Sequence, residues 1–407
     1  MGYLSASAEA GKFDLMAAVQ HLQANGGPNG FRQAVHLLRH RFGSSGASYE
    51  EYFTYALWRA DRGRAFLNEF LPGSRVKAFN AALAMPSRGV PTEVIADKLH
   101  TEAILLARGL PVTRTTAAFL PQGATDPALS DPALSDPALS DPALSGGALP
   151  LRPLHSAADI AAFLSDPANL PVFGKPRSDS FARGAAAIAE KASATVVRFL
   201  NGTTAPATAL AAEIAADWST GYLFQPFYQC HADLRRHVGP AMASVRIVTL
   251  LTDRGVEPWY AVIRVPAKTA MHDGGAADAR IWGLIDLATG TITKIRNLRD
   301  PMTADVTHWL DPDTPLAGFT LPHWPQAMAA ALAGHDSFPG HGIIGWDVFL
   351  TDAGALLNEA NANPGHVYQV AAGRGLMNPD LAPAYARALA FAAQVNAAAP
   401  TGPIASA

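Results

Sequence analysis

Apolar residues recur at helical spacing through the first part of the chain. Residues 13–22 and 31–42 place them three and four positions apart, and a stretch rich in glycine and proline at 26–30 separates the two segments. No stretch here alternates with a period of two. The pattern therefore predicts a helical domain over residues 1–95.

Two more helices in this region carry local signals for their ends. One is expected over residues 49–62, where Ser48 stands as the N-cap and Glu51 completes a capping box. Residues 92–98 are expected to lead into the other, which ends at Ala107 because Gly109 and Pro111 follow.

Later in the chain, runs of β-branched residues separated by turn residues predict hairpins. Residues 245–251 and 259–265 flank Asp253-Arg254-Gly255, which is typical of a hairpin turn. The alanine-rich stretch 185–194 has no clear boundaries. Further strands are expected at 170–176, 281–287, 291–295, 348–350 and 355–357, and further helices at 159–164, 205–218, 324–333 and 380–399. A helical start followed by strands with interposed helices predicts an α+β fold with a mostly antiparallel sheet.

One segment is repetitive. Asp-Pro-Ala-Leu-Ser occurs four times in succession between Asp126 and Ser145. A five-residue period matches no solenoid repeat, and a proline in every unit excludes a continuous helix. The repeat predicts a surface loop, at residues 123–149, that duplication has lengthened.

Composition and charge exclude several classes of protein. Of the 407 residues 49% are apolar, and 31 basic residues against 34 acidic ones give a net charge of −3. This composition excludes disorder of the whole chain, and the near-neutral charge argues against a nucleic-acid partner. Cys230 is the single cysteine, so there is no disulfide framework and no zinc site built from cysteines.

The sequence also bears on location. No uncharged apolar run approaches the ~20 residues that span a bilayer, and residues 1–20 lack the apolar stretch of a secretory signal. We therefore expect a soluble, cytoplasmic protein. Arg32, Arg39 and Arg41 are interpreted as a solvated helix face. The oligomeric state is left open.

The strongest chemical signal lies near the C-terminus, in Gly345-Trp346-Asp347 and Asn358-Glu359-Ala360-Asn361. If the strands around Asp352-Ala353-Gly354 form a hairpin, Asp347 comes close to Glu359 and Asn361. Glu359 and Asn361 are two positions apart and therefore share a face. Two carboxylates and a carboxamide are hard oxygen donors, which suits Mg²⁺. The sequence predicts a magnesium site here.

A second signal is Gly174-Lys175-Pro176, followed by a polar loop that includes Ser178. A lysine at a strand end, before such a loop, can neutralise nucleotide phosphates. It lacks the glycine spacing of a P-loop, so alone it is a weak signal.

Taken in order, these motifs resemble the ATP-grasp superfamily. The series runs from Asp97-Lys98 through Gly174-Lys175-Pro176 and Ser244-Val245-Arg246-Ile247-Val248-Thr249 to Asp347 and Glu359-Ala360-Asn361. The residues of these motifs are similar to those of the sugar-transfer-associated ATP-grasp subfamily, and the resemblance covers about residues 90 to 375. It implies a helical N-terminal domain, a small lid at 96–235 and a catalytic domain at 236–400.

The resemblance also implies roles for individual residues. ATP is expected to contact Lys98 and Lys175, and the segment from Ser178 to Gly184 is the candidate lid loop. The segment 222–227, with Phe224, Gln225 and Phe227, matches the hinge that binds adenine; many relatives have an acidic residue near the position of Gln225. Asp347, Glu359 and Asn361 match the Mg²⁺ ligands. Arg246 matches an arginine near the transferred phosphoryl group or the substrate carboxylate, and either Arg264 or Lys268 supplies a further cation.

The activity implied is ligation of a carboxylate to an amine with ATP and Mg²⁺, through an acyl phosphate. An amino acid joined to a sugar-, lipid- or peptide-linked acceptor fits these residues. Two alternatives stay open: a kinase that phosphorylates a hydroxyl group at the same ATP site, and a nucleotide-binding scaffold that has lost catalysis.

Overall fold

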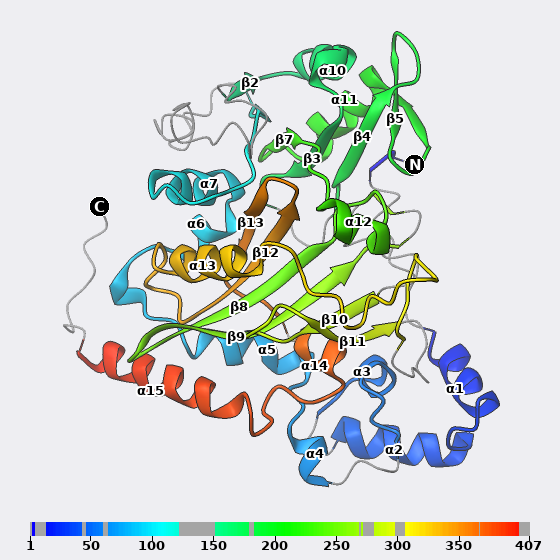
Figure 1. Ribbon diagram of the computed structural model, residues 1–407, viewed down its shortest axis with the longest axis vertical. Coiled ribbons are helices and arrows are strands. Elements are labelled where there is room, and N and C mark those ends of the chain that lie inside the picture. Colours follow the sequence, from blue (N-terminus) through cyan, green and yellow to red (C-terminus); the bar gives the residue numbers. More distant parts are fainter. Residues whose placement is uncertain are drawn as a thin grey trace.

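The computed structural model describes residues 2–4, 14–42, 46–59, 64–121, 151–178, 183–267, 270–271, 281–297, 306–365 and 367–398. Within these ranges two β-sheets form the frame of the molecule, a seven-stranded one above a six-stranded one in Figure 1. The repeat at 126–145 lies outside the described residues, so its interpretation as a surface loop stays a prediction.

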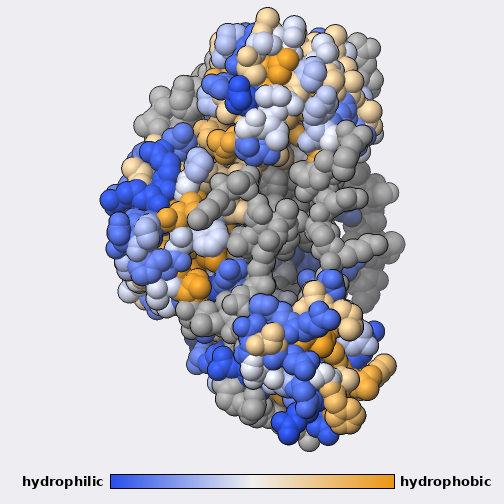
Figure 2. All heavy atoms as spheres, turned by 90° about the vertical axis from the view of Figure 1, so that its right-hand side faces the viewer, coloured by the Kyte–Doolittle hydropathy of each residue, from blue (hydrophilic) through white to orange (hydrophobic). Residues whose placement is uncertain are grey.

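The N-terminal region is helical, as predicted, and its helices α1 to α4 form the lower lobe in Figures 1 and 2. Ser48 and Glu51 form the expected capping box, in which each side chain accepts a hydrogen bond from the other's backbone N–H. The helix that they open ends at Thr54 and not at residue 62, since Ala56 turns the chain with a φ of 50°. The helices are α1 (Leu15–Ala24), α2 (Gly30–Phe42), α3 (Tyr49–Thr54), α4 (Arg64–Asn68), α5 (Gly73–Ala81) and the short η2 (Pro86–Arg88).

The helix expected to end at Ala107 is α7 (Lys98–Ala107), and the residues leading into it form a separate short helix, α6 (Thr92–Ala96). Asp97 separates them because its backbone is extended, with φ −86° and ψ 108°. Its carboxylate accepts hydrogen bonds from the backbone N–H groups of Leu99 and His100, which caps α7. Asp97 therefore fixes the start of α7, where Lys98 is the first residue.

The seven-stranded sheet is built from short strands, and we call it the smaller sheet; the six-stranded sheet has longer strands, and we call it the larger sheet. The smaller sheet has the strand order β2-β1-β7-β3-β4-β5-β6, in which β1 and β2 are parallel and the other neighbours antiparallel. Two helices, α10 (Ala157–Ser165) and α11 (Ala207–Asp217), contribute Ile160, Leu210 and Ile214 to its core. The alanine-rich stretch without clear boundaries contains strand β4. The strands are β1 (Ala117–Phe119), β2 (Arg152–Leu154), β3 (Val172–Pro176), β4 (Ala186–Lys191), β5 (Val196–Phe199), β6 (Thr204–Pro206) and β7 (Tyr222–Pro226), and η5 (Pro167–Asn169) precedes β3.

The larger sheet is antiparallel throughout, in the order β11-β10-β9-β8-β12-β13. Its strands are β8 (Ser244–Thr252), β9 (Gly255–Val265), β10 (Ile281–Ile285), β11 (Ile292–Asn297), β12 (Ile343–Thr351) and β13 (Gly354–Asn361). The hairpin predicted around residues 253–255 is confirmed as β8–β9, and the two short strands expected near 348 and 355 are the much longer β12 and β13.

Successive residues of β8 face opposite ways, so the larger sheet has a core on each side. Ile247 packs in the core that includes Trp324 and Leu99, whereas Val248 packs in the core that includes Tyr368 and Tyr385. Helices thus cover both faces of this sheet, with α13 on one side and α14 and α15 on the other (Figure 1). These helices, with α12, have the bounds α12 (Ala232–Val238), α13 (Trp324–His335), α14 (Val367–Ala372) and α15 (Ala382–Ala398).

The α+β fold class with antiparallel sheets is therefore confirmed. The domain boundaries at 95 and 235 stay predictions. Helices α6 and α7 lie against β13 of the larger sheet, although both precede the smaller sheet in the chain. In the part of the chain that the structure describes, no helix combines the length and apolarity needed to cross a membrane.

A buried histidine links α13 to the larger sheet and makes the stability of the fold depend on pH. His335 is fully buried; its Nδ1 lies 2.7 Å from Thr249 Oγ1 and its Nε2 lies 2.7 Å from the carbonyl oxygen of His341. Since a carbonyl only accepts, Nε2 carries the proton and Nδ1 accepts from the threonine hydroxyl. Burial lowers the pKa of His335 from 6.5 to about 4.

The lowered pKa predicts a loss of stability in acid. Because the fold favours neutral His335, its contribution is fully present above pH 6.5 and is lost as the pH falls from 6.5 towards about 4. The loss amounts to about 3 kcal/mol at most. Urea unfolding midpoints at about pH 7.5, 6 and 4.5 measure it, and His335→Gln should flatten the dependence. If the unfolding midpoint fell with decreasing pH as steeply in the variant as in the wild type, this account would be contradicted.

Candidate active site

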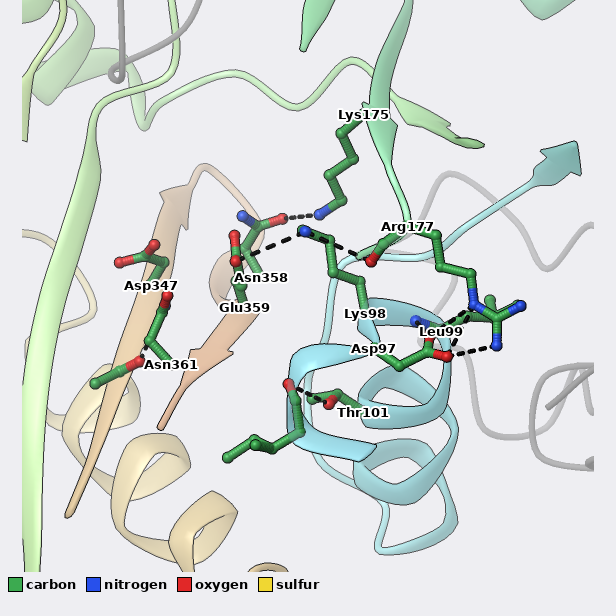
Figure 3. Close-up of polar contacts among 12 residues, drawn as sticks. Asp97, Lys98, Leu99, Thr101, Lys175, Arg177, Asp347, Asn358, Glu359 and Asn361 are labelled. Carbon is green, nitrogen blue, oxygen red and sulfur yellow. Dashed lines mark hydrogen bonds and ion pairs between the residues drawn. The ribbon is translucent and has the colours of Figure 1, made fainter. Parts of the chain in front are cut away.

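The candidate site lies where the end of β3 in the smaller sheet and the start of α7 meet the β12–β13 hairpin of the larger sheet. Figure 3 shows Lys98 and Lys175 pointing towards Asn358 and Glu359, with Asp347 and Asn361 beside them. Segments far apart in the sequence therefore bring both lysines and the acidic residues of the two sequence signals together.

The hairpin carries the three predicted metal ligands on one face. Asp347 pairs directly with Glu359 across β12 and β13, and Gly345 pairs with Asn361. Side chains of directly paired residues, and of residues two apart in a strand, point the same way. The predicted convergence is therefore present in the backbone register. The sequence suggested that Asp347 begins a strand, but it lies in the middle of β12.

A β-bulge interrupts this hairpin at the site. Val348 pairs with Leu357 while Asp347 pairs with Glu359, so Asn358 is an extra residue in β13. In a regular strand Asn358 and Glu359 would point to opposite faces, but both lie near the lysines in Figure 3. The Asn358 carboxamide oxygen accepts a hydrogen bond of 3.0 Å from Lys175 Nζ. Sequence analysis missed Asn358 because a bulge depends on how two strands pair.

Two arginines surround Asp347. Arg246, opposite it in β8, donates from Nε to Oδ1 at 2.5 Å and from Nη2 to Oδ2 at 2.9 Å, and Nη2 of Arg264 lies 2.9 Å from Oδ2. Burial alone would raise the pKa of Asp347, but the guanidinium groups of Arg246 and Arg264 outweigh it and hold this pKa below its ordinary value. Asp347 is therefore ionised and lies next to two fixed cations.

Gly345 allows one of these arginines to lie where it does. A Cβ atom at position 345 would come within 2.5 Å of Pro364 Cβ and 3.0 Å of Arg246 Cδ. With only a hydrogen atom there, the Pro364 carbonyl oxygen accepts a 3.0 Å hydrogen bond from Arg246 Nη1. The glycine of the Gly-Trp-Asp motif thus serves close packing around Arg246.

The two lysines are held in nearly dry surroundings. Lys175 is 5% exposed, and burial lowers its pKa from 10.5 to about 8 even though Glu359 counteracts the shift. Lys98 Nζ lies 3.9 Å from Glu359 Oε1 and donates over 3.5 Å to the carbonyl oxygen of Arg177. Both ammonium groups therefore face Asn358 and Glu359 in β13.

An ion pair that sequence analysis missed fixes Lys98 relative to β3. The Arg177 guanidinium, just after β3, donates from Nε to both carboxylate oxygens of Asp97 at 2.9 Å and from Nη2 at 2.5 Å. Both side chains are largely buried, which strengthens a bidentate pair. The carboxylate that caps α7 thus also ties the helix start to the strand of Lys175.

Next to the lysines is a cavity of about 10 Å³, the size of a single water molecule. Gln225 of β7 borders it, and its Nε2 donates to Thr113 Oγ1 at 3.3 Å. Glu102 also borders it and accepts hydrogen bonds from the backbone N–H and the hydroxyl group of Thr115, at 2.8 and 2.6 Å. Burial raises the pKa of Glu102. The remaining lining residues are Ile95, Lys98, Thr101, Leu105, Val112, Thr113, Lys175, Leu357, Asn358, Glu359 and Ala360.

Other predicted ligand contacts lie apart from this cavity. Phe224 is fully buried in the core of the smaller sheet, where its ring centre lies 4.9 Å from that of Phe163 with the ring planes tilted by 42°, and Phe227 packs against the same core. Ser178 is exposed just before residues 179–182, which lie outside the described residues, as does Lys268. The roles of Phe224, Phe227, Ser178 and Lys268 stay predictions.

The donor set suits magnesium better than a transition metal. Asp347, Glu359 and Asn361 offer only oxygen ligands, which Mg²⁺ prefers, and the set is open to solvent on one side because Glu359 is 27% exposed. Among the described residues there is no cluster of three or more histidine, cysteine, aspartate or glutamate side chains that could hold a metal ion. An all-protein metal cage is thus absent from those residues, while a site completed by water or phosphate oxygens fits them.

Comparison with known proteins adds the family. The family model described as sugar-transfer associated ATP-grasp matches residues 87–381. No curated protein matches the chain. Solved structures that resemble it include the D-Ala:D-Ser ligase VanG of Enterococcus faecalis, at 14% identity over 74% of this chain and 62% of that one, with a TM-score of 0.38. The D-alanine-D-alanine ligase of Coxiella burnetii follows, at 13% identity over 74% and 59%, with a TM-score of 0.34.

The chain thus spans about three fifths of the length of these two ligases. The family match covers the site described above from Lys98 to Asn361 and every strand of both sheets, and it agrees with the order of motifs along the sequence. This chain therefore belongs to the sugar-transfer associated ATP-grasp family.

Proposed function

We propose that this protein is an ATP- and Mg²⁺-dependent ligase that joins a carboxylate to an amine through an acyl phosphate. The observation that carries the proposal is the meeting of two lysines from one side of the site with an acidic hairpin that has two arginines beside it. Transfer of a phosphoryl group requires positive charge around the transferred oxygens, and this arrangement supplies four cationic side chains within a largely buried region.

Each residue has a distinct part in this proposal. Lys98 and Lys175 hold the phosphates of ATP, and Gln225 lies towards the base. Asp347, Glu359 and Asn361 would hold Mg²⁺, which would neutralise charge on the phosphates. Arg246 and Arg264 pair with Asp347 in this structure and would stand beside a metal held there, where their positive charge would favour the transferred phosphoryl group or the substrate carboxylate.

The proposed reaction has two steps, phosphoryl transfer and then amide formation. A carboxylate oxygen of the first substrate attacks the γ-phosphorus of ATP, the bond to the bridging oxygen breaks, and ADP leaves. The amine of the second substrate then attacks the acyl carbon, inorganic phosphate leaves with the C–O bonding pair, and the nitrogen loses a proton. The acyl phosphate must be kept from water during this sequence.

The small cavity indicates that the site has to open for ATP. A pocket for a ligand of nucleotide size has a volume of at least about 300 Å³, far above the 10 Å³ found beside the lysines. We therefore expect the smaller sheet to move away from the β12–β13 hairpin when ATP enters and to close over it afterwards. Closure of this kind would exclude water from the acyl phosphate.

Trapping with hydroxylamine tests the reaction class. The purified protein is incubated with ATP, Mg²⁺, hydroxylamine and a panel of amino acids and other carboxylic acids, and hydroxamate and phosphate are measured together. The proposal predicts equal amounts of both for at least one acid. ADP formed with a phosphorylated hydroxyl product and no free phosphate would indicate a kinase, and no ATP consumption across the panel would indicate a scaffold; either result contradicts the ligase.

A further inference from the structure

A surface far from the candidate active site has an unusual composition. Three of the most exposed large apolar side chains of the described residues are on helix α2: Phe31 and Phe42 are each 79% exposed and Leu38 is 54% exposed. They are seven and four residues apart, so they form one stripe along the helix. Ala34 and Val35 lie between them on the same face. We call these five residues the α2 stripe.

The opposite face of α2 already has its partners. Gln33 is fully buried and donates from Nε2 to the carbonyl oxygens of Val19 and Pro28, at 3.2 and 2.7 Å. Leu37 is buried in the core of the N-terminal helices, and Tyr52 of α3 lies 3.3 Å from His36 Nδ1. The inner face of the helix thus packs against α1 and α3, and the α2 stripe faces outward.

Arginines flank the α2 stripe on both sides. Each residue step turns a helix by about 100°, so Arg32 and Arg39, which follow Phe31 and Leu38, line one edge, and Arg41, which precedes Phe42, lines the other. The Arg41 guanidinium lies 6.0 Å from the Phe42 ring centre. Between residues 14 and 42 the only acidic residue is Asp14, whereas the whole chain has a net charge of −3. Figure 2 shows apolar and hydrophilic surface side by side on the lower lobe that contains this helix.

We propose that the α2 stripe docks the protein onto the surface of an anionic lipid bilayer. An apolar stripe bordered by arginines on both edges is the pattern of a helix that lies in the interface, with its apolar side chains among the acyl chains and its cations at the headgroups. The stripe runs along the outside of a single helix, and a fluid bilayer accepts such a convex surface without a complementary groove.

A second copy of the chain is a poorer occupant. A symmetric dimer through this face would bring the arginine-lined edges of two stripes together, and like charges at close range oppose association. The histidines of α2 do not add to the charge near neutral pH. Burial, followed by the charges of Arg39 and Arg32, lowers the pKa of His36, and burial followed by His36 lowers that of His40.

Sedimentation with lipid vesicles tests the proposal. The full-length protein should sediment with vesicles of phosphatidylglycerol mixed with phosphatidylcholine, remain in solution with phosphatidylcholine alone, and be released at high salt. Phe31→Ser with Phe42→Ser should lower binding by about tenfold or more for each phenylalanine. Replacement of Arg32, Arg39 and Arg41 by glutamine should lower it by about fivefold for each arginine.

Control variants separate the α2 stripe from general effects. Leu389→Ser changes an exposed leucine on α15, and Arg198→Gln changes an exposed arginine on β5; neither should alter vesicle binding. The melting temperature should be the same for all variants, because every substituted side chain is exposed. The proposal is overturned if the wild-type protein does not sediment with anionic vesicles. It is also overturned if the protein self-associates in solution and the double phenylalanine variant abolishes this self-association.

Discussion

Glu359→Ala is expected to lower ATP turnover by a factor of at least about 1,000 while leaving the fold intact. Glu359 faces Asp347 across the hairpin and shares a face with Asn361, so its loss would leave the proposed metal with one carboxylate. In the fold Glu359 forms a long ion pair with Lys98, at 3.9 Å, and its side chain is 27% exposed. Removing it should change the free energy of unfolding by about 1 kcal/mol or less.

Steady-state turnover, with urea unfolding alongside, measures both effects. Glu190→Ala is a matched control, because Glu190 is also a strand glutamate in an ion pair, with Arg198, but is 63% exposed and away from the lysines. The control should keep wild-type turnover. A Glu359→Ala variant that is folded and fully active would rule out Glu359 as a ligand of the metal.

Lys175→Met is expected to raise the KM for ATP by roughly 10- to 100-fold, the worth of one hydrogen bond to a charged group. Methionine keeps much of the length and apolar volume of the lysine but removes the cation that would face the phosphates. Lys175 is 5% exposed, and burial of its charge is itself unfavourable, so the substitution should change the free energy of unfolding little. The variant does lose the 3.0 Å hydrogen bond that Lys175 donates to Asn358.

The matched control for this variant is Lys191→Met. Lys191 lies on the neighbouring strand β4 and donates to the carbonyl oxygen of Ser165 at 2.7 Å, away from the hairpin. Its KM for ATP should equal that of the wild type. If Lys175→Met bound ATP as tightly as the control, Lys175 would have no part in holding the nucleotide.

Local sequence signals predicted those parts of the fold that depend on nearby residues. The β8–β9 hairpin followed from β-branched runs around residues 253–255, and the start of α3 followed from Ser48 and Glu51. Strand β4 could not be predicted in this way. Its alanines favour a helix intrinsically, and it is a strand because it pairs with β3 and β5 and is buried there.

In the candidate site too, the sequence predicted the residues that lie in local motifs but not the contacts that depend on tertiary structure. The order of motifs along the chain singled out both lysines and the three oxygen ligands. The salt bridges of Asp347 with Arg246 and Arg264 follow from the pairing of β8 with β9 and β12, which brings residues about a hundred positions apart together. The contributions of Asn358 and Arg177 depend on a bulge and on a contact between a helix start and a strand end. Neither leaves a periodic signal in the sequence.

Thermal melting with ATP and Mg²⁺ tests the central claim, that a magnesium-bound nucleotide occupies the space between the lysines and the β12–β13 hairpin. ATP in large excess over its dissociation constant should add about 2–4 kcal/mol to the stability and raise the melting temperature by several degrees. EDTA should abolish most of the shift, and Lys175→Met should reduce it. A folded protein whose melting temperature does not change with ATP and Mg²⁺ would contradict the account.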